Sequence, residues 1–445
     1  MRKPSGVATL AVMGGLLLII SIAVLYLNRQ AVTDIRSTGV GAARHAAQEA
    51  AEAGLVWASQ RLNAATGIGR DCAPASGATS SFRRLYVQPA GRDTPVAPAS
   101  AFPGCKLRAQ GLSCSCPDPA GAERRSTASG PEAAFSLVFS AVTDAAGVVV
   151  PDAVRVTATG CSAHAGSCPP GQRPGGKGPD AVSQASAVFK LHPLLIARPA
   201  AALTCAGRCV IGSGFRLQNR DTATNGLIAN AGGDVSGCST ESGSVQGNCR
   251  RLQGTPLGEA LKPSDLALSG IASSDSSCAA GALMRRYFTQ PLDELRDTPM
   301  VLPLGPCATS GACAAPMKEA LEAGVRVFHL PGEFRLDAGV GSTIGSALDP
   351  VVLIAEGPLT ISGGVVVHGL VFMQKPNAEN LQIDNATVNG AVVSCGSTNL
   401  SRSGLIDYHT ATMTSLVKSN KYFRRVAGSW TDLCQASASG TVTCR

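Results

Sequence analysis

The feature that most constrains this chain is an apolar segment near its start. From Val7 to Leu27 there is no charged residue, and a run of this length can cross the hydrocarbon core of a bilayer as one helix. Arg2 and Lys3 precede the run, and basic residues stay on the cytoplasmic side of a membrane segment. The sequence therefore predicts a single-pass membrane protein with a cytoplasmic N-terminus and an exported C-terminal bulk.

The helical pattern continues beyond the apolar run. No proline occurs between Asn28 and Asn63, and small or apolar residues recur at steps of three or four, which is the spacing of one helix face. These residues are Ala43, Ala47, Ala51, Leu55, Ala58 and Leu62. We expect one helix over residues 7–63, roughly 85 Å long at about 1.5 Å per residue. Such a helix is too long for its own domain, so its small-residue stripe is expected to pack against helices of other subunits.

Cysteine usage indicates the same compartment. The chain has 16 cysteines and none precedes Cys72, which is typical of a disulfide framework in an oxidising environment. Spacing favours five local pairs, although connectivity does not follow from sequence alone. The pairs are Cys161 with Cys168, Cys205 with Cys209, Cys238 with Cys249, Cys307 with Cys313, and Cys434 with Cys444.

Two cysteine groups need separate treatment. Cys114 and Cys116 are expected to reach different partners, because a bridge between them would be strained. Cys161, His164 and Cys168 are zinc-ligand types at close spacing. No paired CxxC or HxxxH array accompanies them, so we expect disulfides rather than a metal site.

The N-terminal region resembles a type IV prepilin. A short basic leader, Met1 to Gly6, is followed by the apolar run and then by a protruding helix. The stretch AAQEAAEAGL at residues 46–55 is similar to the "QAAEAGL" segment of PilX-type pilus assembly proteins. LMRRYFTQPLDELRDTP, PVVLIAEGPLTISGGVVVHGLVF and GSW, in that order, also resemble the C-terminal regions of large PilX-type proteins.

The resemblance implies processing and partners. In that family a prepilin peptidase cuts after the glycine, here Gly6, and leaves Val7 as the new N-terminus. Major pilins have a glutamate as the fifth residue after the cut, where this chain has Ala11. PilX-type and some tip-located pseudopilin subunits also lack that glutamate. The resemblance therefore implies a minor, tip-proximal subunit.

The exported portion has two patterns. Residues 64–130 are rich in Gly, Pro, Ser and Ala, contain four cysteines and predict a disulfide-stapled loop region. Strand-like runs at 134–142, 148–150, 154–160 and 187–191, the third of them alternating, predict an antiparallel sheet. Further on, Leu359–Val371 and Leu381–Val393 look like two copies of one unit. Their offset of about 22 residues is typical of a β-solenoid turn; an antiparallel sandwich of short strands is the alternative.

These patterns predict an α+β fold in four parts. They are a leader (1–6), a transmembrane and pilin-like helix (7–63), a loop-rich antiparallel β head stapled by disulfides (64–200), and a β-rich, solenoid-like domain (201–445) with a helical insertion at about 257–323.

No catalytic motif is present. The six histidines are scattered, and the sequence contains no HExxH, GxSxG or GxxxxGK[ST] pattern. We expect no enzymatic activity, no cofactor and no metal. The net charge of +8 is mild and aromatic residues are only 4% of the chain, so no specific nucleic-acid partner is expected.

The expected function is that of a minor pilin-like structural subunit. It would promote type IV pilus assembly near the tip, contribute to adhesion through a surface ligand, and contact other pilins, the prepilin peptidase and the inner membrane before reaching the periplasm or the cell-surface pilus. One alternative is a type II secretion pseudopilin. The other is a membrane-anchored β-solenoid that binds or degrades polysaccharide.

Overall fold

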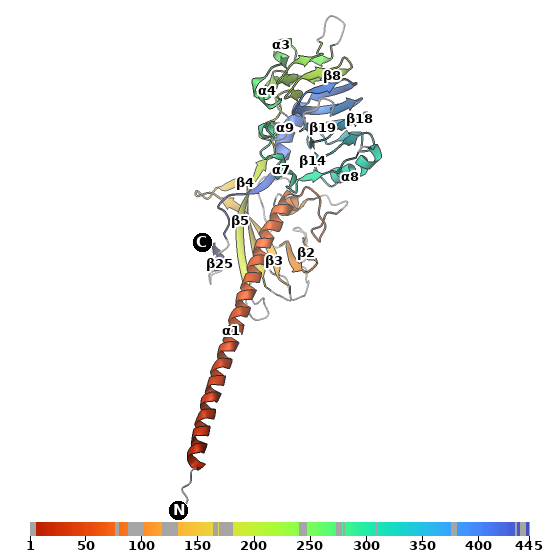
Figure 1. Ribbon diagram of the computed structural model, residues 1–445. Coiled ribbons are helices and arrows are strands. Elements are labelled where there is room, and N and C mark those ends of the chain that lie inside the picture. Colours follow the sequence, from red (N-terminus) through yellow and green to blue (C-terminus); the bar gives the residue numbers. More distant parts are fainter. Residues whose placement is uncertain are drawn as a thin grey trace, which may run out of the picture.

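The computed structural model describes residues 6–75, 80–87, 102–117, 132–162, 168, 181–239, 247–272, 278, 281–307, 309–374, 381–431, 434–436 and 442–444. Figure 1 shows three parts arranged roughly in line. A long helix projects from one end, an antiparallel sheet packs on the second half of this helix, and a stack of parallel strands lies beyond the helix C-terminus.

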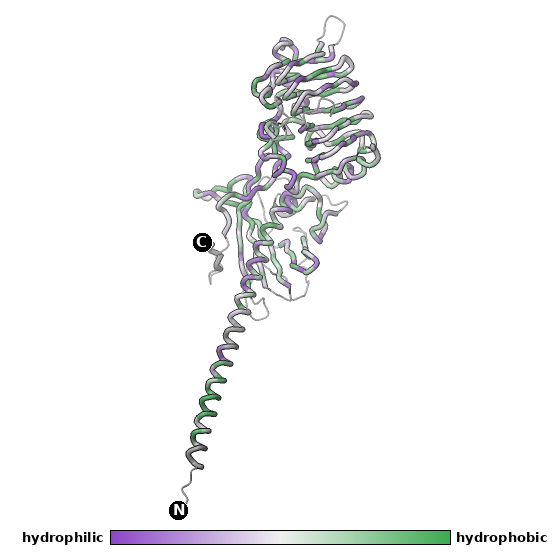
Figure 2. Tube along the Cα trace, in the orientation of Figure 1, coloured by the Kyte–Doolittle hydropathy of each residue, from purple (hydrophilic) through white to green (hydrophobic). Residues whose placement is uncertain are grey.

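Helix α1 (Gly6–Asn63) is continuous over 58 residues. In its last four turns, the side chains on one side of the helix are buried, and these side chains are small or aliphatic. They are Ala47, Ala50, Ala51, Leu55, Ala58 and Leu62. The earlier part of the helix stands clear of the body (Figures 1 and 2).

The antiparallel sheet has the strand order β2-β1-β3-β4-β5-β24. The strands are β1 (Gly104–Arg108), β2 (Gly111–Ser115), β3 (Ala134–Thr143), β4 (Val149–Cys161), β5 (Val182–Pro193) and β24 (Lys421–Arg425). Alternate residues such as Leu137, Val156 and Ala187 face α1 and are fully buried. Strand β24 comes from the C-terminal end of the chain, so the antiparallel sheet is not confined to the predicted range 64–200.

Helix and sheet approach each other at backbone distance. A Cβ atom at Gly160 of β4 would overlap the carbonyl oxygen of Ala47 and the amide nitrogen of Ala51. On the helix side, a Cβ at Gly54 would lie 3.0 Å from Cδ2 of Phe135. Small residues are therefore required on both surfaces.

Aromatic rings close the end of this core. Helix α2 (Phe82–Tyr86) places Phe82 edge-on to Trp57 at 5.3 Å and against Tyr86 at 4.8 Å between ring centroids. Asn63, at the end of α1, donates from Nδ2 to the Phe423 carbonyl oxygen (2.9 Å) and accepts from the Phe423 amide (2.6 Å). This side chain fastens the helix to β24.

The parallel stack is a coil whose strands form three ladders. Ladder 1 contains β13 (Val301–Pro303), β14 (Val327–Leu330), β17 (Val351–Ala355), the second halves of β19 (Val366–Met373) and β21 (Thr387–Ser394), β6 (Leu203–Cys205), β9 (Ala229–Ala231) and β12 (Leu261–Lys262). Ladder 3 contains β16 (Thr343–Ile344), the first halves of β19 and β21, β23 (Gly404–Tyr408), β8 (Phe215–Asn219) and β11 (Cys249–Arg250).

Ladder 2 consists of two separate three-stranded sheets. One contains β15 (Phe334–Leu336), β18 (Leu359–Ser362) and β20 (Leu381–Asp384), and the other contains β22 (Thr398–Leu400), β7 (Cys209–Ile211) and β10 (Val235–Ser236). The two stretches that resemble copies lie side by side, because Leu359 pairs with Leu381 and Val367 with Val388. All strand pairs of the coil are parallel, which excludes the antiparallel sandwich.

The coil starts in the middle of its own stack. Strands β6, β7 and β8 pair with β21, β22 and β23, so the first and last turns are neighbours. From β8 the chain continues to one end of the stack, where α3 (Leu257–Ala260) precedes β12. It then crosses to the other end through a segment whose described helices are α4 (Leu266–Ala272), α6 (Met284–Tyr287) and α7 (Leu292–Arg296). Helix α8 (Ser310–Glu322) packs on β15. Helix α9 (Thr410–Ser419) packs on β19 and β21.

The predicted fold class and localisation are wrong in one central respect. Among the residues that the structure describes, no helix is long and apolar enough to cross a membrane. Apart from α1 and short helices, the described chain is mostly β-strand. Single-pass anchoring in the inner membrane is therefore not supported.

Candidate assembly interface

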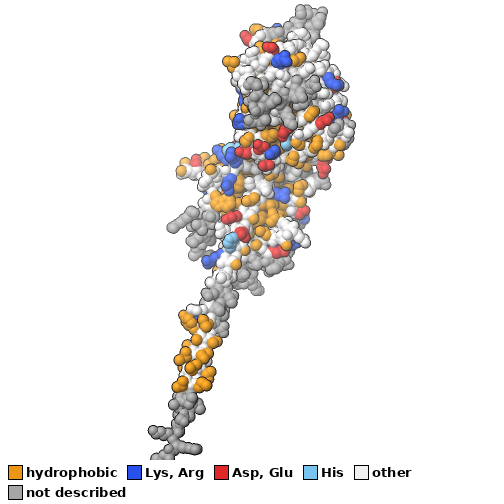
Figure 3. All heavy atoms as spheres, in the orientation of Figure 1, with side chains coloured by type: hydrophobic (Ala, Val, Ile, Leu, Met, Phe, Trp, Pro, Cys, Tyr) orange, Lys and Arg blue, Asp and Glu red, His pale blue; other side chains and the backbone are white. Residues whose placement is uncertain are grey.

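The projecting part of α1 carries an apolar band on all its sides. Twelve large apolar side chains between Val12 and Leu27 are about half exposed or more; they are Val12, Met13, Leu16, Leu17, Leu18, Ile19, Ile20, Ile22, Val24, Leu25, Tyr26 and Leu27. Figure 3 shows this band as a continuous apolar surface. Burying one such side chain is worth about 1.5–3 kcal/mol, so the band strongly favours association.

Glycines of the same projecting segment have no role inside the molecule. A Cβ atom at Gly14, Gly15, Gly39 or Gly41 would meet nothing within 4 Å. Each glycine costs a helix about 1 kcal/mol relative to alanine. Small residues on a helix surface let another helix backbone come close, so these positions fit contact with a second chain.

The predicted stripe of small residues has a different destination. Ala47, Ala51 and Ala58 are fully buried against the protein's own sheet. The expectation that this stripe packs against other subunits is wrong for these positions, because Gly160 and the other small residues of β4 let the sheet reach the helix backbone. The surface left for partners lies nearer the N-terminus.

The predicted processing site lies at the edge of the described chain. Gly6 is the first residue of α1, and residues 1–5 lie outside the described residues. Cleavage between Gly6 and Val7 stays a prediction.

Seven disulfides join described cysteines. Four are local pairs that spacing favours: Cys161–Cys168, Cys205–Cys209, Cys238–Cys249 and Cys307–Cys313. Cys114 and Cys116 reach different partners, Cys105 and Cys72, and Cys278 is joined to Cys395. Strands β25 (Cys434–Ala436) and β26 (Val442–Cys444) place Cys434 opposite Cys444, but the side chains of this predicted pair lie outside the described part.

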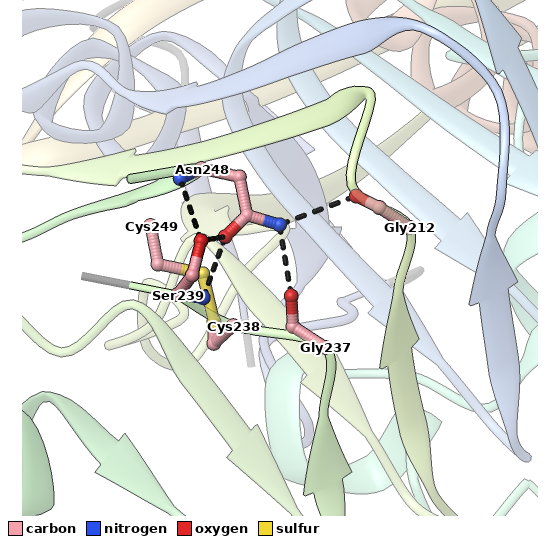
Figure 4. The surroundings of a disulfide bond; sticks show 6 residues. All are labelled: Gly212, Gly237, Cys238, Ser239, Asn248 and Cys249. Carbon is pink, nitrogen blue, oxygen red and sulfur yellow. Dashed lines mark hydrogen bonds between the residues drawn. A yellow bond between two sulfur atoms is a disulfide. The ribbon is translucent and has the colours of Figure 1, made fainter. Parts of the chain in front are cut away.

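The surroundings of one disulfide show a structural polar network. Next to Cys238–Cys249, the buried Asn248 donates from Nδ2 to the carbonyl oxygens of Gly237 (2.9 Å) and Gly212 (3.2 Å) (Figure 4). Its Oδ1 accepts from the amide of Ser239 at 2.7 Å. These bonds satisfy the amide and hold the turn, and they leave it no free group for chemistry.

Two pairs of described side chains, each with a histidine, are candidates for titratable chemistry. Within the described ranges, no three His, Cys, Asp or Glu residues gather to hold a metal ion. Of the three residues considered as zinc ligands, Cys161 and Cys168 form a disulfide with each other, and His164 lies outside the described residues. His329 contacts Glu356 at 2.6 Å in a part-buried pair. His368 and His409 have ring centroids 6.4 Å apart, and burial, then the neighbouring His409, lowers the pKa of His368.

Comparisons with known proteins add little to this geometry. No protein-family model and no curated protein matches the chain. Among solved structures, the competence-associated pilin ComZ from Thermus thermophilus is similar at 12% identity, over 87% of this chain and 97% of that chain, with a TM-score of 0.18. At that TM-score the likeness carries no argument, and the resemblance to PilX-type proteins finds no support in it.

Proposed function

We propose that this chain is a structural subunit of a type IV pilus-like filament, a minor pilin whose projecting helix packs among the helices of other subunits. The apolar band on Val12–Leu27 carries the proposal. A single partner on one side of the helix would leave the apolar side chains on the opposite side exposed to water, whereas a bundle of helices covers the band on all sides. The exposed glycines support close packing in that bundle.

The position of the parallel stack supports a place near the filament tip. The stack lies beyond the C-terminal end of α1, roughly in line with the helix (Figure 1). In a filament of parallel helices, this stack occupies the space in which a neighbouring subunit on the tip side would lie. A subunit of this shape therefore fits the end of the filament, where the stack is free for adhesion.

Filament incorporation tests the proposal. We expect Leu18→Asp with Leu25→Asp to remove the chain from sheared, purified filaments, because two carboxylates then interrupt the band. Leu348→Asp is the matched control, since Leu348 is 80% exposed on the stack and should leave incorporation unchanged. Wild-type amounts of the double variant in filaments would overturn the proposal.

Processing and filament type need two further measurements. N-terminal sequencing of the mature chain should give Val7 as the first residue if the prepilin peptidase is a partner. A deletion strain should lose piliation and twitching. Intact pili with a defect in protein secretion would instead assign the chain to a type II secretion pseudopilus.

A further inference from the structure

Ladder 2 of the coil is interrupted between two successive turns. Strand β20 pairs with β18, and strand β22 pairs with β7, but β20 and β22 are not paired with each other. At the same height ladder 1 continues from β19 through β21 to β6, and ladder 3 continues from β21 to β23. The interruption is therefore confined to one side of an otherwise continuous coil.

A cleft occupies the interruption. It has a volume of about 170 Å³ and is lined by both strands and by the turn that follows β22. Gln382, Asn399, Ser401 and Arg402 line the cleft and are exposed. Leu381, Ile383 and Leu400 also line it, but their side chains belong to the buried core. These three residues therefore present mainly backbone to the cleft.

The chemistry of the cleft is that of hydrogen bonding with little net charge. The edge of an unpaired strand offers backbone N–H and C=O groups, and Gln382 and Asn399 add one amide from each strand. Arg402 donates from Nη1 to Oδ2 of Asp384 at 3.1 Å, and Ser403 Oγ donates to the other carboxylate oxygen at 3.3 Å. The charges of Arg402 and Asp384 offset each other, which favours a neutral ligand rich in hydroxyl or amide groups.

The dimensions exclude an added peptide strand. Paired strands lie about 4.8 Å apart, so a strand inserted between β20 and β22 would separate them by about 9.6 Å. Cα atoms of the two strands approach within 8 Å. The cleft is also smaller than the roughly 300–1,000 Å³ of drug-sized pockets, so it has room for a single small ring.

We propose that the cleft between β20 and β22 binds one saccharide unit of a neutral glycan. The sugar ring would lie over the opening between the strands, where the exposed amides of Gln382 and Asn399 would bond its hydroxyls, and the turn at Ser401 and Arg402 would border one end. This inference does not depend on the filament proposal. In a tip subunit, it would give the stack a ligand class for adhesion.

Direct binding with the purified full chain tests the inference. The probes are chitotetraose, mannan and dextran as neutral saccharides, with polygalacturonate as an acidic comparator and an extended peptide library as the strand-like comparator. We expect at least one neutral saccharide to bind, with an apparent affinity reduced at least about tenfold in Gln382→Ala with Asn399→Ala, since each variant removes one or more hydrogen bonds.

A matched control separates the cleft from the rest of the coil. Gln218→Ala with Asn389→Ala changes the same residue types on ladder 3, where both are half-buried, and should bind like the wild type. Both double variants should enter filaments normally, which distinguishes this inference from the proposed function. No binding of any neutral saccharide, binding of polygalacturonate or peptides alone, or equal affinity in the cleft variant would overturn it.

Discussion

The two halves of helix α1 use similar residues for opposite purposes. From Ala47 to Leu62 the helix is buried by its own sheet, and the glycine of the opposing strand, Gly160, is needed for contact. From Val12 to Leu27 larger apolar residues and glycines touch no other part of the described body. The comparison teaches that apolar character alone does not identify an interface; the surface that remains exposed after folding does.

The largest expected difference between the two halves is in amide hydrogen exchange. Most helical stability in proteins comes from tertiary packing, which the projecting half lacks. Amides from Val12 to Val40 should therefore exchange at least about a thousandfold faster than those from Ala51 to Leu62, which open only with global unfolding. Mass spectrometry of exchanged peptides measures this ratio. Equal protection of the two halves in the monomer would contradict this difference, and protection of the first half only in filaments would support it.

The next largest effect is expected where the sheet meets the helix backbone. Gly160→Ala should destabilise the protein by about 3 kcal/mol or more, because its Cβ overlaps backbone atoms of Ala47 and Ala51. Urea unfolding of the purified chain measures the change. Gly41→Ala is the control in the projecting half and should cost nothing. A wild-type unfolding midpoint for the Gly160 variant would contradict the close approach.

Replacing two leucines of α1 by alanine should give stability losses that differ nearly as much. Leu55 is 1% exposed and Leu25 is 69% exposed. Leu55→Ala should cost about 2–5 kcal/mol through lost burial and a cavity, whereas Leu25→Ala should stay within about 0.5 kcal/mol in the monomer. Thermal and urea unfolding of both variants give the comparison. Similar losses at both sites would show that the first half is packed in the monomer.

The smallest expected effect is in the stability changes of two glycine-to-alanine variants, which should have opposite signs. Gly54→Ala brings a Cβ to 3.0 Å from Phe135 Cδ2 and 3.1 Å from the Ala158 Cβ, so we expect a net loss of about 1 kcal/mol. Gly39→Ala meets nothing and should raise helicity, worth about 1 kcal/mol locally. Circular dichroism and urea unfolding measure both. If Gly39→Ala also leaves filament incorporation intact, Gly39 is not a close-packed position.

The sequence pattern located much of the secondary structure. The proline-free stretch predicts α1, strand-like runs at 134–142 and 154–160 predict β3 and β4, and the copies at 359–371 and 381–393 predict neighbouring turns. Each of these predictions depends on contacts that are local or periodic. The length of the apolar run, in contrast, suggested a membrane span that the described helix does not support. Helical periodicity identifies a stripe such as Ala47–Leu62 but does not say whether its cover comes from the same chain.

Contacts between segments far apart in the chain could not be predicted from the sequence. Cys278 has no nearby cysteine, and its bridge to Cys395 spans a separation of 117 residues. The pairing of β6 with β21 has no repeat signal, because the first turn follows the antiparallel sheet directly and the last turn lies far along the chain. The cleft between β20 and β22 is likewise invisible in sequence, since it results from strands that fail to pair.

The adjacency of the first and last turns has a consequence for biosynthesis. On a ribosome or during export, Leu203–Asn219 emerges early, yet the strands that cover one side of it, Thr387–Tyr408, arrive only near the end of translation. Until then three strand edges of the nascent chain lack their permanent neighbours and are open to wrong pairing. Such non-local closure is slow, so productive maturation of this subunit depends on protecting a half-built coil until its final segment arrives.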